Sequence, residues 1–424
     1  MEIKSKILKG DKYIWGAFFG LCLISILSMY SASGTLTYTS DDIYDPIIRH
    51  AKFLVGSVIV VFVVHYIHYK YLRLFGFPLF IISSLLLIWA LFFGEKLNDA
   101  SRWIIIPHTG IRIQPSELAK LGVIILSSYF LAKGQNEKGV STNAFKKVLI
   151  IVGTSCLLIF TENFSTAALI GLVSYCMMII AGVSFKKLGI LLLFVMIFVG
   201  SILGTAYILD KKYPDSKGGF MKVMHRANEW NSRIASFFEK SDGKKSFEED
   251  TNDDNYQEHH ASMAIANSNG IGLGPGNSQE RDFLPQAYSD FIYAIIIEEY
   301  GILGGLIVMG LYISILFRAY QNTRRCTQAF PAFLMMGIAM LIVFQAIINM
   351  MVATGVMPVT GQPLPMISRG GTSVMITGIY FGILLSISRY ATIENNSNNS
   401  NNSKDEEEIP ESISAPNPNL KDDI

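Results

Sequence analysis

One carboxylate, Asp290, stands where a polar stretch rich in glycine and proline meets a long apolar run. Ser289 precedes it and Phe291 opens the apolar run. A carboxylate at the end of a bilayer-length helix is costly unless it has a partner or a role. Asp290 is therefore a candidate functional residue. The structural alternative is that Ser289 or Asp290 caps the helix that follows.

A second group of charges lies between residues 100 and 120, in Ala100-Ser101-Arg102-Trp103-Ile104 and then Gln114-Pro115-Ser116-Glu117-Leu118-Ala119-Lys120. Pro115 suits the first turn of a helix. Glu117 and Lys120 are three residues apart, so they share a helix face and can pair. An ion pair just inside a span is a functional-site candidate, with a purely structural pair as the alternative. Trp103 also fits an interfacial aromatic anchor.

Two irregular stretches carry further candidates. The first has glycines at 270, 272, 274 and 276, followed by Arg281. It lacks the strand and helix of a dinucleotide fingerprint. Its amides suit either a pyrophosphate or a flexible hinge, and Arg281 can bind a phosphate with two donors. The second stretch, 358–373, repeats proline and glycine and contains Ser368 and Arg369. Such backbone at membrane depth requires a protein-lined cavity, or it is a rigid connector.

Composition indicates the elements that position these residues. The chain has 424 residues, of which 50% are hydrophobic and 16% charged, with a mean hydropathy of +0.37. A soluble domain has about a quarter charged residues, so long apolar blocks indicate an all-α polytopic membrane protein. The net charge of +1 gives no basis for nucleic-acid binding. The four cysteines show no disulfide or zinc spacing, and His259-His260 beside Glu258 is typical of a solvated polar segment, so no metal site is predicted.

About ten transmembrane helices are predicted, each from a run of roughly 20 apolar residues. They lie near 13–33, 47–66, 72–93, 116–132, 146–162, 164–182, 187–209, 289–317, 328–353 and 368–388. Lys and Arg gather in alternate short loops, which predicts that both termini are cytoplasmic. Residues 1–12 then form a cytoplasmic N-terminus, 13–209 hold helices one to seven, 210–288 form a large extracytoplasmic loop, 289–390 hold helices eight to ten, and 391–424 form a disordered cytoplasmic tail. Within the loop, Trp230 and Arg233 belong to a helix-spaced pattern suited to the bilayer surface.

Three blocks together resemble one family. The first block comprises the two stretches around Arg102 and Lys120, and the second is the stretch 358–373. The third is Leu284-Pro285-x-Ala287-x-x-Asp290-Phe291-Ile292 followed by Glu298-Glu299-x-Gly301. They resemble the SEDS family, the polytopic peptidoglycan glycosyltransferases of the FtsW and RodA type, over roughly residues 13–390. Asp99 replaces a usual glycine, and 161–167 matches the family only at Thr166-Ala167, so that stretch stays outside the predicted site. Arg369 favours the division type, FtsW, over the elongation type, RodA.

The resemblance implies polymerisation of lipid II into glycan strands at the outer face of the bacterial cytoplasmic membrane. It implies Asp290 as catalytic base, with substrate bound by Arg102, Trp103, Glu117, Lys120, Arg281, Ser368 and Arg369. A divalent cation (Mg²⁺ or Mn²⁺) is a possible cofactor, and no other is implied. The implied partners are a class B penicillin-binding protein transpeptidase and other division proteins. The alternatives are a lipid II flippase, for which broken membrane segments are typical, an elongation-type polymerase, and a non-catalytic division scaffold.

Overall fold

The computed structural model describes residues 8–32, 45–97, 100–105, 112–137, 139–160, 162–212, 230–235, 237, 253–284 and 287–407. Within them, 9 helices are long and apolar enough to cross a membrane. They are α2 (Lys12–Ala32), α4 (Asp45–Tyr66), α5 (Tyr69–Phe93), α6 (Pro115–Lys133), α7 (Thr142–Phe160), α9 (Phe185–Lys212), α12 (Ile292–Thr323), α13 (Ala329–Ala353) and α14 (Thr372–Glu407). The shorter apolar helix α8 (Phe164–Ile180) completes the predicted set, and the all-α polytopic prediction is confirmed.

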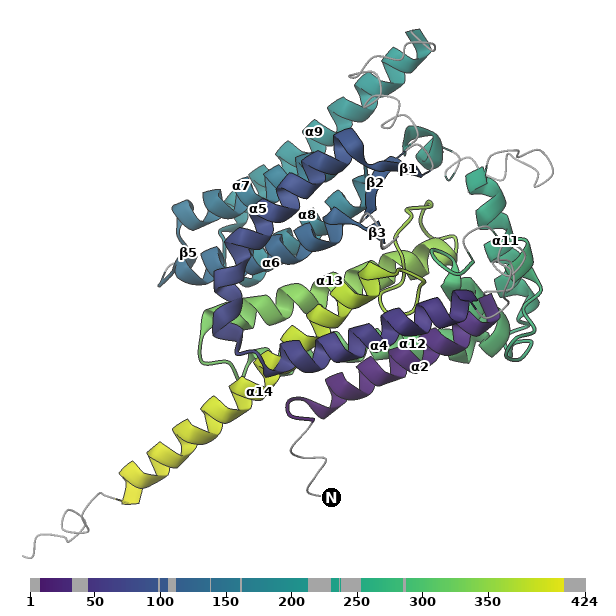
Figure 1. Cartoon of the computed structure of the whole chain (residues 1–424). Coiled ribbons are helices and arrows are strands. Elements are labelled where there is room, and N and C mark those ends of the chain that lie inside the picture. Colours follow the sequence, from purple (N-terminus) through teal and green to yellow (C-terminus); the bar gives the residue numbers. More distant parts are fainter. Residues whose placement is uncertain are drawn as a thin grey trace, which may run out of the picture.

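Helix α13 lies in the middle of the bundle (Figure 1). It packs against α6 and α8 on one side and against α12 and α14 on the other. Its interior positions are filled by side chains such as Leu334, Ile338 and Ala346, none of which is exposed. Helix α9 projects from the bundle and shows most of its apolar side chains at the surface, as expected of a helix that faces lipid acyl chains. Helix α13 is therefore among the most buried helices of the bundle, together with α6 and the apolar span of α14.

A polar cluster, called the latch here, joins the residue before α2 to the end of α12 and to the end of the apolar span of α14, Thr372–Ala391. Arg318 Nη2 lies 2.6 Å from Asp11 Oδ2, and Asn322 Nδ2 donates to the same oxygen over 2.7 Å. The Asp11 N–H donates to Ser388 Oγ over 3.0 Å. Burial alone raises the pKa of Asp11, but the hydrogen bonds from Arg318, Asn322 and the Tyr13 N–H outweigh it and hold that pKa below its usual value. The latch places the start of α2, the end of α12 and the end of the apolar span of α14 on one side of the membrane, here called the Asp11 end.

The opposite side, the Asp290 end, carries most of the non-helical structure. A small antiparallel sheet joins β1 (Glu95–Leu97), β2 (Ala100–Ile105) and β3 (Arg112–Ile113), and it packs against the ends of α5 and α6. The long loop contributes α11 (Asp253–Asn267) and the 3-10 turn η1 (Glu280–Asp282). At the Asp11 end, β4 (Gln135–Asn136) pairs with β5 (Gly139–Val140) between α6 and α7.

Two segments differ from expectation or add to it. The helical residues around Trp230 do more than face the bilayer, since the Trp230 ring lies 4.8 Å from that of Phe164 and Arg233 Nη1 donates to Val359 O over 3.1 Å. The backbone of α14 continues to Glu407 through a tract predicted to be disordered from 391. An existing helix extends without a new nucleation cost, which accounts for this difference. Residues 408–424 lie outside the described part of the chain.

Candidate active site

Asp290 lies in the turn immediately before α12, with its side chain partly buried. The N-cap position of α12 is Phe291, whose own side chain makes no capping hydrogen bond. Neither Ser289 nor Asp290 therefore occupies the N-cap position itself. Ser289 Oγ instead donates to Asp290 Oδ1 over 3.0 Å. The Ser289 hydroxyl therefore helps to orient the Asp290 carboxylate.

The segment between the C-cap of α13, Thr354, and the start of α14 comprises residues 355–371 and is called the connector here. Side chains from five different elements donate hydrogen bonds to its carbonyl groups. Irregular backbone at membrane depth requires such protein donors, because no water is available to bind its polar groups. The donors are Arg233 to Val359 O (3.1 Å), Ser165 to Thr360 O (2.9 Å), Asn349 to Gln362 O (2.8 Å), Gln345 to Pro363 O (2.9 Å), Tyr312 to Pro365 O, and Ser25 to Ile367 O (3.1 Å). The connector is thus a fixed part of the bundle.

The connector is hydrogen-bonded to the turn that contains Asp290. The Arg369 N–H donates to Tyr288 O over 2.9 Å, and Ser368 Oγ donates to Ser289 O over 2.5 Å. The Arg369 guanidinium also lies over the Tyr288 ring, 5.4 Å from its centroid. Three of the predicted site residues, Asp290, Ser368 and Arg369, therefore come together although they are far apart in the sequence.

The predicted Glu117–Lys120 ion pair forms in the first turn of α6, which begins at Pro115 as expected. Lys120 Nζ lies 2.8 Å from Glu117 Oε1, and both side chains are buried. Lys120 Nζ also donates to Gln345 Oε1 over 2.9 Å. Since Gln345 in turn binds the connector, the buried ion pair is joined to the same hydrogen-bonded assembly as Asp290.

The glycine-rich loop packs on a break in α12. Gly301 interrupts that helix with φ 69° and ψ −171°. The N–H groups of Leu273 and Gly274 donate to the freed carbonyls of Glu298 and Glu299, both over 2.9 Å. A Cβ at Gly272 would lie 2.4 Å from Glu299 O, so only glycine allows this close approach. Those two amides serve the helix break, which gives the loop a structural role.

Glu298 is a residue that the sequence reasoning did not place in the site. Its fully buried carboxylate accepts hydrogen bonds from Gln279 N (3.0 Å), Glu280 N (3.2 Å) and Ser278 Oγ. It thereby fixes the turn that carries Arg281, whose Nη1 donates to Gly276 O over 2.8 Å. The available signal was a pair of acids inside an apolar run, because a buried carboxylate needs such donors.

The remaining predicted residues lie on the small sheet. Arg102 and Trp103 belong to β2, and Trp103 pairs in register with Glu95 and is partly buried. The Arg102 side chain lies outside what the structure describes. Thr372 Oγ1 donates to Arg112 O over 2.9 Å, which attaches the sheet to the start of α14. The sheet is therefore adjacent to the connector, while the described contacts do not bring Trp103 to Asp290.

His260 is paired with a carboxylate from another element. Its Nδ1 lies 2.6 Å from Glu280 Oε2, and its ring stacks on Phe283 at 6.0 Å. Among the described residues, no group of three or more His, Cys, Asp and Glu side chains is arranged to hold a metal ion. The His260–Glu280 contact ties α11 to η1.

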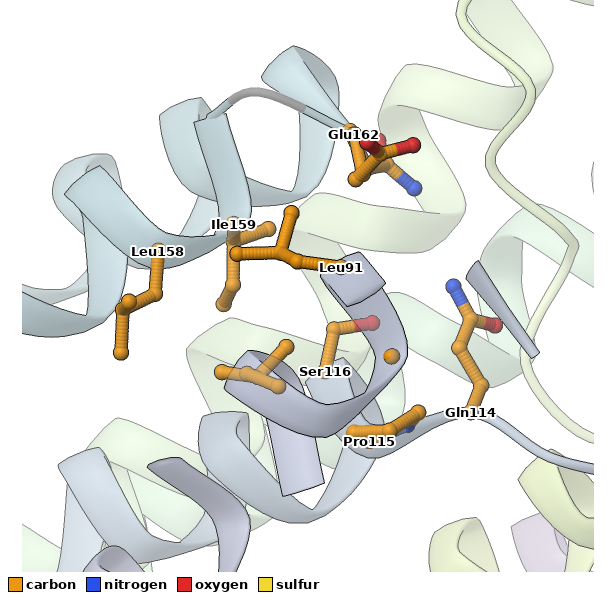
Figure 2. Close-up of a pocket in the computed structure, with 10 residues that line it drawn as sticks. Leu91, Gln114, Pro115, Ser116, Leu158, Ile159 and Glu162 are labelled. Carbon is orange, nitrogen blue, oxygen red and sulfur yellow. The ribbon is translucent and has the colours of Figure 1, made fainter. Parts of the chain in front are cut away.

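A narrow crevice opens at the Asp290 end, between the ends of α5 and α7 and the starts of α6 and α8 (Figure 2). Leu91 and Ile159 form apolar walls, and Gln114, Ser116 and Glu162 supply polar atoms. Asn163, which also lines the crevice, accepts from Gln362 Nε2 over 3.4 Å. The crevice is thus connected through Gln362 to the connector.

These features define a polytopic helical membrane protein with a carboxylate and a buried ion pair joined in one polar assembly at the Asp290 end. Residues 11–393 match the family model of the FtsW, RodA and SpoVE cell cycle proteins. The chain belongs to this family, as the sequence resemblance predicted.

Similar proteins cover most of the chain. The probable peptidoglycan glycosyltransferase FtsW of Halomonas elongata is 28% identical over 384 residues, covering 89% of this chain and 90% of that protein. The same-named protein of Marinobacter nauticus is 30% identical over 374 residues, covering 87% and 85%. A chain of a solved peptidoglycan synthase complex matches with a TM-score of 0.66 at 22% identity, covering 90% of this chain and 98% of that one. The rod shape determining protein RodA of Thermus thermophilus matches with a TM-score of 0.62 at 19% identity, covering 90% and 97%. These two structures share the fold.

Proposed function

We propose that this protein is a peptidoglycan glycosyltransferase that polymerises lipid II into glycan strands during cell division. Membership of the family and the relatives named FtsW support this activity and the division role. The observation that carries the proposal is the position of Asp290: it stands one residue before the N-cap of α12, and three hydrogen bonds fix its turn to the connector and α13. A carboxylate held in this way is arranged for proton transfer.

In the proposed reaction, the 4-hydroxyl of the acceptor sugar attacks the anomeric carbon of the growing strand. The new bond joins that oxygen to the anomeric carbon, and the bond to the pyrophosphate oxygen breaks, so undecaprenyl pyrophosphate leaves. The hydroxyl proton passes to Asp290. Ser368 and Arg369 lie beside the Asp290 turn, so the work of the site is chiefly to position two lipid-linked sugars.

The cations have distinct parts in this proposal. The Lys120 ammonium is engaged by Glu117 and Gln345, so its part is to organise the assembly. Arg281 and Arg102 belong to the loop and sheet at the Asp290 end, where an anionic pyrophosphate arrives. A divalent cation is a further candidate counter-charge. The described residues do not form a ligand set for one, so the mechanism contains no metal step.

We further propose that the Asp290 end faces outward and that both termini are cytoplasmic, in the bacterial inner membrane. The basic short loops at the Asp11 end support this orientation. The proposed partner is a class B penicillin-binding protein transpeptidase, with contacts on the outer ends of α13 and α14 and on the long loop. Other division proteins complete the assembly.

The break in α12 favours one second candidate, a lipid II flippase, because discontinuous helices are common in transporters. Here, however, the loop at 270–274 fills the break with main-chain hydrogen bonds, which leaves those groups unavailable to a transported ligand. The polymerase is therefore the function that the geometry supports better.

The test is polymerisation of lipid II by the purified protein in liposomes, with and without the transpeptidase partner. The proposal expects glycan polymer, strongly increased by the partner. Transfer of lipid II between leaflets without polymer in either arm would contradict it and favour the flippase.

A further inference from the structure

We propose that Gln345 and Asn349 of α13 are positioning residues that hold the Asp290 turn and tie it to the buried Lys120 ammonium. The inference rests on the proposed function, because it assigns these two amides to the placement of its general base. Neither side chain touches the reacting atoms in this account. They act through the main chain around Asp290.

Asn349 donates hydrogen bonds to two main-chain carbonyls from its one amide nitrogen. Its Nδ2 donates to Asp290 O over 2.7 Å and to Gln362 O over 2.8 Å, and the side chain is only 1% exposed. Both acceptors are main-chain oxygens, so the amide can face them only with its NH₂ group. The nitrogen therefore fixes the backbone of the candidate base against the connector.

Gln345 repeats this arrangement one helical turn earlier. Asn349 stands four positions after Gln345 in the sequence, so both amides project from the same face of α13. Gln345 Oε1 accepts from Lys120 Nζ over 2.9 Å, and its Nε2 donates to Pro363 O over 2.9 Å. Its orientation is also determined, because a lysine supplies only donors and a carbonyl only accepts.

The two amides bind adjacent connector carbonyls, at Gln362 and Pro363. Asn349 also donates to the Asp290 main-chain carbonyl, and Gln345 also accepts from the Lys120 ammonium. A rigid helix turn therefore sets the separation between the base and the cation. This matters for the reaction, because displacing a catalytic group by about 1 Å can lower the rate about 100-fold.

The alternative is that the amides only hold helices together. Interhelical polar contacts in membranes each add modestly to stability, so their loss would lower stability and leave the turnover of each folded molecule unchanged. A positioning role instead predicts that turnover is affected more strongly than stability. Turnover should fall while the concentration of lipid II needed for half-maximal rate changes little.

The experiment compares kcat and KM for lipid II polymerisation by the full chain with its transpeptidase. Asn349→Asp and Gln345→Glu keep the side-chain shape but turn a donor nitrogen into an oxygen facing a carbonyl. Asn349→Ala removes the donor without adding an acceptor. Thr354→Val is the matched control on α13, since the Thr354 hydroxyl bonds only to carbonyls of its own helix.

We expect kcat to fall about 100-fold in Asn349→Asp, with KM within about threefold of wild type. We expect a smaller loss in the same parameter for Gln345→Glu and Asn349→Ala, and none for Thr354→Val. If Asn349→Asp does not fold, Asn349→Ala decides the question. If the wild type is active and the folded Asn349 variants have a wild-type kcat, or differ from it only in KM, the inference is overturned. A wild type that makes no polymer would instead contradict the proposed function.

Discussion

The main-chain N–H of Arg369 donates a hydrogen bond to the carbonyl of Tyr288 over 2.9 Å. This contact joins the connector to the turn that ends at Asp290. It explains why sequence blocks far apart in the chain belong to one site. It also implies that a change in the connector alters the candidate base without touching its side chain.

The Glu117–Lys120 pair should be sensitive to loss of one partner. Glu117→Ala leaves the Lys120 ammonium buried with Gln345 as its remaining described acceptor, and such changes typically cost about 3–5 kcal/mol. Glu117→Gln keeps an acceptor oxygen and should cost less. Thermal unfolding in detergent and polymer yield measure both variants. Wild-type stability and activity in both would show that the pair is dispensable.

The break in α12 requires glycine at 301. A Cβ there would lie 2.5 Å from Gly270 O, and its φ of 69° is unfavourable for other residues. Gly301→Ala should therefore destabilise the protein by at least about 1–3 kcal/mol, the cost of a strained backbone. Gly310→Ala on the same helix meets no atom within 4 Å and is the matched control. Equal unfolding temperatures for the two variants would refute this account of the break.

The sequence was most informative where the determining contacts are local. Pro115 marked the start of α6, and the spacing of Glu117 and Lys120 predicted their pairing, because both effects act within one helical turn. The transmembrane helices could be predicted from the length of each apolar run, because that property is also local. Hydropathy placed α9 among them without revealing that it projects from the bundle.

Contacts across long separations could not be predicted in this way. Ser368 and Ser289 are 79 residues apart, and nothing in the local pattern of either specifies the other. The N-cap of α12 falls at Phe291 rather than at Ser289 or Asp290, and the turn at Asp290 is fixed by the connector and α13. Asn349 and Glu298 gave little local signal, since their roles depend on backbone groups brought close by the tertiary fold.

The Asp11 latch should stabilise the protein at neutral pH. Because the folded pKa of Asp11 is lowered, its contribution is complete above the unfolded value of about 3.9 and is lost as pH falls below it. Asp11→Asn should therefore lower the unfolding temperature by a constant amount between about pH 6 and 8, and the difference from wild type should narrow only below about pH 4. A difference that already narrows between pH 8 and 6 would contradict the assignment.

Topology can be tested with two matched exposed positions. Gln279 lies in the loop at the Asp290 end and Gln328 between α12 and α13. All four native cysteines are free thiols and are first replaced by serine. In intact cells, an impermeant reagent should label Gln279→Cys and should reach Gln328→Cys only after permeabilisation. The reverse pattern would place Asp290 on the cytoplasmic side.

The central claim is that Asp290 takes the proton from the acceptor hydroxyl. Asp290→Asn retains the size of the side chain and the oxygen that Ser289 binds, and Asn349 still holds the main-chain carbonyl. This variant should fold and bind its partner. Loss of a general base typically costs about 10²–10⁴-fold in rate. Asp282→Asn, at an exposed carboxylate in the same loop, is the matched control.

The most direct measurement is the rate of lipid II polymerisation by Asp290→Asn beside wild type and Asp282→Asn, each purified with the transpeptidase. The account predicts a loss of at least about 100-fold for Asp290→Asn and a wild-type rate for Asp282→Asn. A polymerisation rate near that of wild type in a folded Asp290→Asn protein would contradict it.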